Sequence, residues 1–415
     1  MNRPIDYGWL LAIIIGFTII SCENDYTNTS LENKTNEKNV SLDLAKQVAL
    51  NFTKDKAFIK KPDKVSTNAD VLRSNQKLDK EIKEAYVVSQ GDEPAFYIIL
   101  FEPNGFAFIS ATVKEEPVIA FSESAEFDFD NLPIGLNQWI DFQKQRIISI
   151  KNSDIEVPQE LLDEWDRYLG HPDFDPETGD DPVDNPNEGN YHIVKGPLMQ
   201  TTWGQGCGYN NLINSNCNSG GACNRPWTGC VATAMAQIIR YYEYPNNYDY
   251  SIMLDKVEFA DRNTTGANEI SKLMRDVGNA VDMDYGCGGS GADTEDEVAS
   301  SFKNDFGYSS ATYHNNYNGS TKYEWVKSEI NADRPVIFRG GEQKHWGGVI
   351  PYYADGHAWV CDGYMSTGFN GSSHLKFHMN WGWNDAHDGW YSFNNFNPNG
   401  NTFNYKVGIV TNIRP

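Results

Sequence analysis

The sequence predicts an α+β fold in two parts, a small α+β domain followed by a larger domain that combines a helical part with an antiparallel sheet. Helix and hairpin patterns within residues 41–149 predict the small domain. A buried helix at 230–242 and alternating strands at 355–364 and 375–383 predict the two parts of the larger one. The 415 residues, of which 40% are apolar, are enough for two domains to bury a core.

The small domain starts with a helix and continues with strands. Ser41 is a suitable N-cap, and apolar residues recur after it at helical spacing. Two apolar and aromatic runs are joined by Pro-Asn-Gly at 103–105, which is typical of a β-hairpin. We expect helices at 41–53 and 136–149 and strands at 95–101, 106–109 and 118–121. These elements assign residues 41–150 to the first domain.

The N-terminus has the pattern of an exported lipoprotein. Arg3 precedes an apolar stretch at 9–20 that is too short for a comfortable transmembrane helix but suits a signal peptide. A small residue then precedes Cys22, so we expect residues 1–21 to be removed and Cys22 to carry lipid. Residues 22–40 are a polar tether to the membrane of the bacterial cell envelope, from which maturation could release the protein. A plain secretory peptide is the alternative.

The net charge of -23 makes a nucleic-acid partner improbable, because affinity for phosphates depends on Lys and Arg. Residues 197–415 hold 15 basic and 22 acidic side chains, so most of the excess acid precedes them. Residues 171–189 contain four prolines, seven acids and no Lys or Arg. This composition predicts an exposed linker, assigned to 151–190, that a protease can reach. The remaining residues, 191–415, form the second domain.

Cys230 begins the buried helix of the second domain. The apolar stripe of that helix consists of Val231, Ala234, Met235, Ile238, Ile239 and Tyr242. At a helix N-terminus, free N–H groups and the helix dipole favour a thiolate, which is the nucleophilic form of cysteine. A lone cysteine in such a helix more often fills a packing gap, so the interpretation depends on a base elsewhere in the chain.

His357 and Asn380 supply that base and its partner. They lie 127 and 150 residues after Cys230, in two predicted strands, and this order and spacing agree with a papain-like Cys, His, Asn arrangement. In this scheme His357 deprotonates Cys230 and later protonates the leaving amine. Asn380 fixes the imidazole tautomer through a hydrogen bond, and Trp381 shields that hydrogen bond from water.

These motifs resemble the streptopain family of papain-like cysteine peptidases. The resemblance rests on Gly-Cys-Val-Ala-Thr-Ala at 229–234, Gly-His-Ala-Trp-Val at 356–360 and Asn-Trp-Gly-Trp at 380–383. It extends upstream to Trp-Gly-Gln at 203–205 and to the middle of the domain at 273–286. The family implies a papain-like fold, an endopeptidase acting through a thioester on Cys230, and Gln205 as the side-chain donor of the oxyanion hole.

The family also implies a zymogen. The first domain is similar to the family's inhibitory prodomain, which keeps Cys230 and His357 out of productive geometry until it is removed. The predicted linker supports this independently, and we expect the cut between residues 171 and 195. The chain departs from the family at 394–405, where a Gly-rich loop is replaced by a polar segment with one glycine, Gly400. Substrate preference therefore does not carry over.

Six cysteines remain if Cys22 is lipidated, and their pairing does not follow from the sequence. Cys217 and Cys223 bracket a Gly-rich segment, which makes them one candidate disulfide. With Cys230 as nucleophile an odd number is left, and Cys361 is the candidate free thiol. A zinc site is a weak alternative, because no CxxC pair or regular histidine partner is present. We expect neither a metal nor a cofactor.

Two further motifs favour ordinary structure. Residues 286–291 fit GxGxxG, but four acids follow at once and would repel a phosphate, so we interpret them as a surface loop. His374 and His378 lack the glutamate of a zinc protease helix and are interpreted as strand-surface residues. Beside the endopeptidase, two functions stay open: an acyltransferase or amidase with the same three residues, and an idle lipoprotein that binds a surface partner.

Overall fold

The computed structural model describes residues 39–54, 80–169, 191–214, 216–218, 220–315, 322–346, 350–369, 372–392 and 405–415. The predicted signal peptide, Cys22, nearly all of the tether, the acidic run at 171–189 and most of the 394–405 segment lie outside these residues. Within the described part of the chain, no helix is long and apolar enough to cross a membrane.

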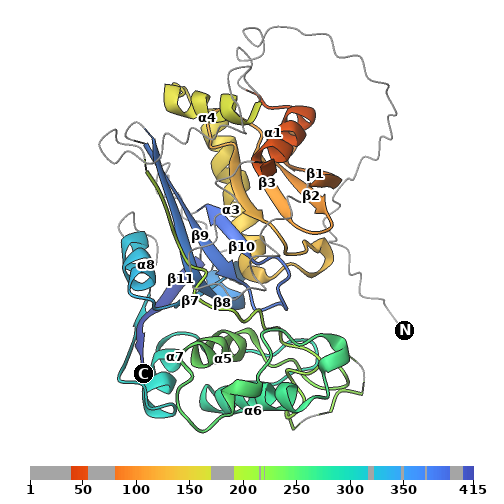
Figure 1. Ribbon diagram of the computed structural model, residues 1–415, viewed down its shortest axis with the longest axis vertical. Helices are drawn as coiled ribbons and strands as arrows, with labels where there is room; N and C mark the ends of the chain where they lie inside the picture. The colour runs from red at the N-terminus through yellow and green to blue at the C-terminus, as the bar shows by residue number, and fades with distance from the viewer. Residues whose placement is uncertain are drawn as a thin grey trace, which may run out of the picture. The chain divides into compact units, whose positions relative to one another are not determined.

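The predicted α+β class is confirmed, with helices and antiparallel strands in each half of the chain (Figure 1). The α-helices are α1 (Leu42–Lys54), α3 (Ile134–Lys151), α4 (Gln159–Leu169), α5 (Cys230–Tyr242), α6 (Thr265–Ala280), α7 (Asp296–Asn304) and α8 (Lys322–Asn331). Short 3₁₀ turns are η3 (Phe129–Asn131), η5 (Tyr250–Ile252) and η6 (Phe259–Asp261).

The strands of the first half are β1 (Glu81–Gln90), β2 (Glu93–Glu102), β3 (Phe106–Ser110) and β4 (Val118–Ser122). The second half contributes β5 (Tyr191–Lys195), β6 (Ser310–His314), β7 (Val336–Trp346), β8 (Ile350–Phe369), β9 (Ser372–Asn380), β10 (Gly389–Ser392) and β11 (Tyr405–Arg414). The predicted hairpin is confirmed as β2 and β3, which pair antiparallel.

The two halves share a single sheet. Its strand order is β1-β2-β3-β4-β10-β9-β8-β7-β11-β6, with β5 pairing on β8. The junction is the short ladder between β4 and β10, in which Phe121 lies opposite Trp390 and Ala120 opposite Tyr391. The first half is therefore held to the second by backbone hydrogen bonds as well as by side-chain packing.

A shared hydrophobic core reinforces this junction. Phe108 and Trp139 from the first half pack in the same buried cluster as Trp359, Trp381 and Tyr391 from the second. The ring of Trp139 contacts that of Tyr391, with 4.9 Å between centroids and a nearly perpendicular arrangement. Because large aromatic side chains from both halves interlock, separating the halves would expose much of this core to water.

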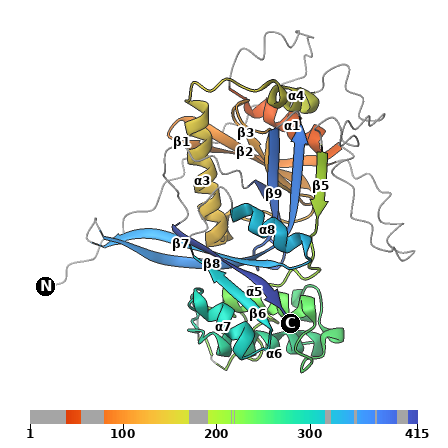
Figure 2. The same cartoon turned by 90° about the vertical axis from the view of Figure 1, so that its left-hand side faces the viewer.

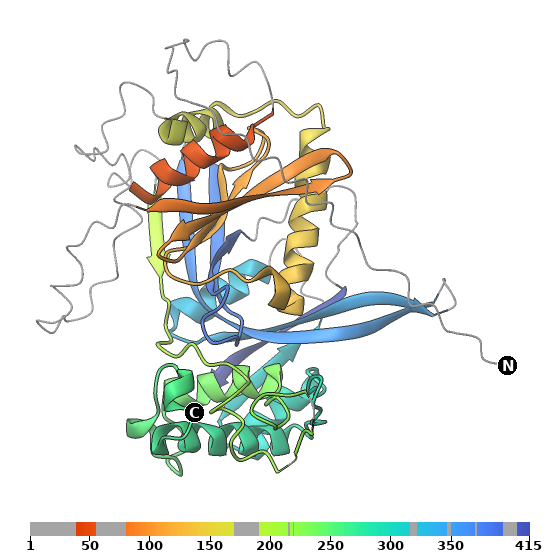
Figure 3. The same ribbon diagram turned by 90° about the vertical axis from the view of Figure 1, so that its right-hand side faces the viewer.

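Two other clusters lie on either side. Helices α1 and α4 cover the outer face of the first half's strands, with Phe52, Trp165 and Leu169 buried there (Figure 3). Helices α5, α6 and α7 form the helical part of the second half and bury Met235, Met274 and related side chains (Figure 1). This helical part and the sheet are the two parts that the sequence predicted.

The segment assigned to the linker contains a helix. Helix α4 lies within the 151–190 range and packs on α1, where Gln47 and Asn51 donate to the carbonyls of Leu169 and Tyr168 at 2.8 Å. This helix therefore packs with the first half of the chain. The acidic composition that indicated a linker begins only after this helix.

Strand β8 is long and pairs with three other strands. Its first part pairs with β7 in a ribbon that reaches away from the rest of the sheet (Figure 2), and its second part pairs with β9 and β5. His357 lies opposite Gly340 within the β7 pairing, just before the pairing with β9 begins at Val360.

Candidate active site

Cys230 is the first residue of α5, as predicted, and a glycine precedes it. Gly229 has a φ of 89°, which L side chains rarely adopt, and a Cβ there would lie 2.6 Å from the sulfur of Met283. Behind Cys230 the helix is buried from Val231 to Ile239. The half-buried thiol is therefore fixed at the end of a rigid, packed element.

The thiol is not set up as a thiolate in this form of the chain. Burial raises the pKa of Cys230, and hydrogen bonds from backbone N–H groups, that of Ala358 first, offset only part of the rise. Burial therefore opposes the thiolate that the helix N-terminus favours. The Ala358 contact places the sulfur beside the residue that follows His357.

His357 is buried in β8, and one ring nitrogen has a partner. Its Nε2 lies 2.9 Å from the backbone oxygen of Trp381. Because a carbonyl oxygen only accepts, Nε2 carries the proton, and Nδ1 keeps its lone pair. Burial lowers the pKa of His357 to about 4, although the Trp381 carbonyl raises it. No hydrogen bond joins this ring to the sulfur of Cys230 among the described residues.

Asn380 does not contact the imidazole. Its side chain exchanges two hydrogen bonds with Gln237 of α5, at 3.0 and 3.1 Å, and donates to the carbonyl of Thr201 at 2.8 Å. The role predicted for Asn380, fixing the imidazole tautomer, falls in this structure to the carbonyl of Trp381. Asn380 instead joins the end of β9 to the helix that carries Cys230, because Gln237 offers a buried amide there.

Trp381 is buried, and its ring lies next to that of His357. The centroids of the His357 and Trp381 rings are 6.4 Å apart, and Trp359 lies beside both rings. Helix α3 presses on this pair of indoles: a Cβ at Gly135 would lie 2.7 Å from the ring of Trp359 and 2.9 Å from that of Trp381. The first half therefore contacts the surroundings of the histidine directly.

Gln205 lies close to the same strand end. Its side-chain Nε2 donates to the carbonyl of Gly382 at 3.3 Å, and its backbone carbonyl accepts from the N–H of Thr228 at 3.0 Å. Thr228 is two residues before Cys230, so the backbone of Gln205 is tied to the segment that leads to the thiol. An amide nitrogen has two hydrogens, and the second is available to a developing oxyanion.

Two sequence profiles match this arrangement. The profile described as "Peptidase C10 family" matches residues 203–248 and 246–391, and the one described as "Spi protease inhibitor" matches residues 37–147. The peptidase profile covers most of the second half, and the inhibitor profile covers most of the first half. The chain belongs to the peptidase C10 family. It is a cysteine protease with an inhibitory prodomain, and proteins are its class of substrate.

The relatives support the same assignment. Streptopain from Streptococcus pyogenes is 25% identical over 77% of this chain and 80% of its own length. The thiol protease/hemagglutinin PrtT from Porphyromonas gingivalis is 25% identical over 85% of this chain and 38% of its own length. Prevotella intermedia prointerpain A has the same fold, with a TM-score of 0.54 and 24% identity over 80% of this chain and 99% of its own.

The prodomain of this C10 peptidase meets the catalytic sheet through a buried charged cluster. Glu116 accepts from Lys376 at 2.6 Å and from Ser392 at 2.7 Å, and a nitrogen of His374 lies 3.6 Å away. Burial alone would raise the pKa of Glu116, but Lys376 and His374 outweigh it and hold the pKa below its usual range. Glu164 of α4 completes the cluster, and burial raises its pKa.

The two histidines of β9 are not the surface residues that the sequence indicated. His374 faces Glu116 and Glu164 of the prodomain, which covers this strand. His378 lies 2.7 Å from the carboxylate of Asp362, which raises the pKa of His378 against the effect of burial. Within the described residues, no group of three or more His, Cys, Asp or Glu side chains could hold a metal ion.

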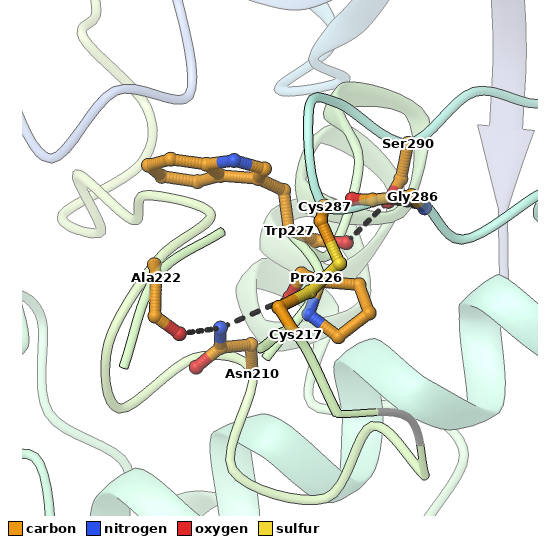
Figure 4. Close-up of a disulfide and its surroundings, with 8 residues drawn as sticks. All are labelled: Asn210, Cys217, Ala222, Pro226, Trp227, Gly286, Cys287 and Ser290. Carbon is orange, nitrogen blue, oxygen red and sulfur yellow. Dashed lines mark hydrogen bonds between the residues drawn. A yellow bond between two sulfur atoms is a disulfide. The ribbon is translucent and has the colours of Figure 1, made fainter. Parts of the chain in front are cut away.

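The cysteines pair differently from the predicted loop. The disulfides are Cys207–Cys223 and Cys217–Cys287, so the expectation of a bond between Cys217 and Cys223 was wrong. The Gly-rich loop at 286–291 lies against the segment before Cys230, so that Cys287 reaches Cys217 (Figure 4). Cys361 is free and buried, as expected.

The glycine loop at 286–291 thereby packs against the segment that leads to Cys230. Ser290 donates to the carbonyl of Trp227 at 2.7 Å and accepts from the N–H of Gly286 (Figure 4). Asn210 supports the same segment by donating to Ala222 and Pro226. The prediction of a surface loop is confirmed at Gly288 and Gly289, which are exposed.

Proposed function

We propose that Cys230 is the nucleophile of this peptidase and that His357 is its general base and acid. The observation that carries the proposal is the hydrogen bond from Nε2 of His357 to the Trp381 carbonyl, which leaves Nδ1 as the basic nitrogen. The sulfur of Cys230 lies beside Ala358, the next residue in β8. The base and the thiol therefore lie on neighbouring parts of the structure, and the active form requires the imidazole to turn toward the sulfur.

In the proposed reaction, His357 takes the thiol proton and the sulfur of Cys230 attacks the peptide carbonyl carbon. A carbon–sulfur bond forms, and the carbon–nitrogen bond then breaks as the amine leaves with the proton from His357. Water, deprotonated by His357, attacks the thioester, and the acid leaves as the thiol is restored. The free N–H of Gln205 and the backbone N–H of Cys230 would stabilise the oxyanion in both steps.

We infer that latency in the precursor comes from the neutral state of this pair. A raised thiol pKa and an imidazole pKa of about 4 leave both groups uncharged near neutral pH. The prodomain packs α3 against Trp359 and Trp381, which flank His357. Its removal would let water reach the imidazole and would allow the thiolate–imidazolium pair to form.

The remaining parts of the proposal concern processing and location. Residues 1–21 would be removed as a signal peptide, and Cys22 would carry the lipid that holds the chain to the membrane by the tether 22–40. The prodomain then extends through α4, and the activating cut falls between residues 171 and 195. The composition of these segments supports this order of events.

An epoxide inhibitor directed at the active thiol tests the catalytic assignment. Processed protein should be labelled once, at Cys230, and should cleave casein, whereas Cys230→Ala and His357→Ala should do neither. Absence of labelling in the processed wild type would overturn the proposal. Labelling without casein cleavage would favour an acyltransferase or amidase. A Cys22→Ser variant, followed through detergent partitioning, tests the lipid anchor separately.

A further inference from the structure

Trp381 begins the turn between β9 and β10, and hydrogen bonds hold both its N–H and its carbonyl. The N–H of Trp381 donates to Oδ1 of Asp388 at 2.7 Å, and its carbonyl accepts from Nε2 of His357 at 2.9 Å. The carboxyl of Asp388 therefore binds the same residue whose carbonyl orients the imidazole. Two hydrogen bonds and one residue separate this acid from the catalytic base.

Burying the carboxyl of Asp388 at this position costs free energy of folding. Asp388 is 7% exposed, and no salt bridge joins it to a cation among the described residues. Burial raises the pKa of Asp388 to about 7, while the N–H of Trp381 lowers it. The charged groups that act on it are His378 on β9, which lowers its pKa, and Asp385 in the turn and Asp362 on β8, which raise it. Burying a carboxyl without a salt bridge destabilises the fold, so its presence here suggests that its hydrogen bond has a specific use.

The other polar residues of the turn attach it to different elements. Asn384 accepts from the hydroxyl of Tyr209 at 2.6 Å, and Asp385 accepts from Lys256 at 2.9 Å. These two contacts anchor the turn to the helical part of the catalytic domain. The Asp388 side chain instead binds the backbone N–H of Trp381. Anchoring the turn to the helical part therefore does not explain why an acid is present at position 388.

We propose that Asp388 is a positioning residue that fixes the backbone of Trp381 and, through its carbonyl, the orientation of His357. This inference rests on the proposed role of His357 as the base. Asp388 touches neither the substrate nor the reacting atoms in this scheme. Its ionised form is the stronger acceptor for the Trp381 N–H, so the orientation of His357 tightens as Asp388 loses its proton.

The test uses processed enzyme in which active thiols are counted by epoxide titration. Asp388→Ala removes the acceptor, and kcat per titrated thiol should fall by about 10- to 100-fold with KM little changed. Asp388→Asn keeps an acceptor oxygen, so kcat should return to within a few-fold of wild type. The same variant should lose the component of the kcat profile that comes from ionisation of Asp388.

Asp385→Asn is the matched control for kcat per titrated thiol, because it changes an acid of the same turn whose carboxylate binds Lys256 and not Trp381. Unchanged kcat per titrated thiol in Asp388→Ala would overturn the inference. If Asp388→Ala fails to fold, an Asp388→Asn enzyme with the wild-type pH profile would overturn it instead. Failure of the underlying assignment is distinct: wild-type enzyme would then leave the epoxide unreacted, or His357→Ala would stay active.

Discussion

We expect Glu116→Gln to weaken the hold of the prodomain on the catalytic sheet. In the precursor the Glu116 side chain is fully buried and lies 2.6 Å from the ammonium of Lys376, which is 11% exposed. Ser392 donates to the other carboxylate oxygen. Glutamine keeps the shape and can still bind Ser392, so the substitution removes the charge with little change in packing.

The size of the effect follows from the burial of the pair. Removing one partner of a buried ion pair costs about 3–5 kcal/mol, because the other charge stays desolvated. Lys376 is slightly exposed, and Glu164 lies nearby, so we expect the lower end, about 3 kcal/mol. Since this charge pair joins the two halves, the docked state of the prodomain should lose about 100-fold in population relative to the open state.

Hydrogen exchange on a Cys230→Ala background measures this without self-cleavage. Backbone amides of β4 and β10, which pair across the junction, should lose protection in Glu116→Gln. The control is Asp141→Asn, which removes the same kind of charge from an exposed pair with Lys144 on α3 and should change stability by less than about 0.5 kcal/mol. Equal exchange in the two variants would refute the reasoning.

Three further outcomes can be measured on the same precursor. Burial lowers the pKa of His387 to about 4, so the unfolded chain binds a proton that the folded one excludes between pH 6.5 and 4. Stability should therefore fall as the pH falls through this window, by up to about 3 kcal/mol, and a His387→Gln variant should flatten the Tm profile. Gly229→Ala should cost about 1–3 kcal/mol from its positive φ, whereas Gly288→Ala, with open space around it, should unfold like wild type. Replacing Cys217 and Cys287 with alanine opens a 70-residue loop and should cost about 3–4 kcal/mol in urea unfolding; an unchanged midpoint would contradict this.

Local patterns predicted the helices α1, α3 and α5 and the strands β2, β3, β4, β8 and β9. The apolar stripe after Cys230 predicted α5 at its observed bounds, because a buried helix repeats every 3.6 residues regardless of its partners. The hairpin followed from two apolar runs joined by Pro-Asn-Gly. Strand β1 was not predicted, since its partly exposed residues mix the two faces, and α4 was hidden next to an acidic linker. The other helices and strands of the second half, α6 to α8, β5 to β7, β10 and β11, were not predicted either.

For the candidate site, the sequence predicted the elements that carry Cys230 and His357 but not the hydrogen bonds around them. The side chain of Asn380 bonds Gln237 and not the imidazole, which bonds the carbonyl of Trp381. Neither Gln237 nor the acid that holds Trp381 stood out in the sequence. A buried glutamine within an apolar helix stripe and an acid just before a strand are the only local signs of them.

The sequence by itself determined the type of each chemical group, its element and the order of the elements, because these depend on side-chain chemistry and short-range periodicity. Tertiary structure decided which buried polar groups are partners. Glu116 and Lys376 are 260 residues apart, and Cys217 and Cys287 are 70 apart. Over such separations a hydrogen bond, ion pair or disulfide forms only where folding removes water and fixes the distance, and no local pattern encodes that.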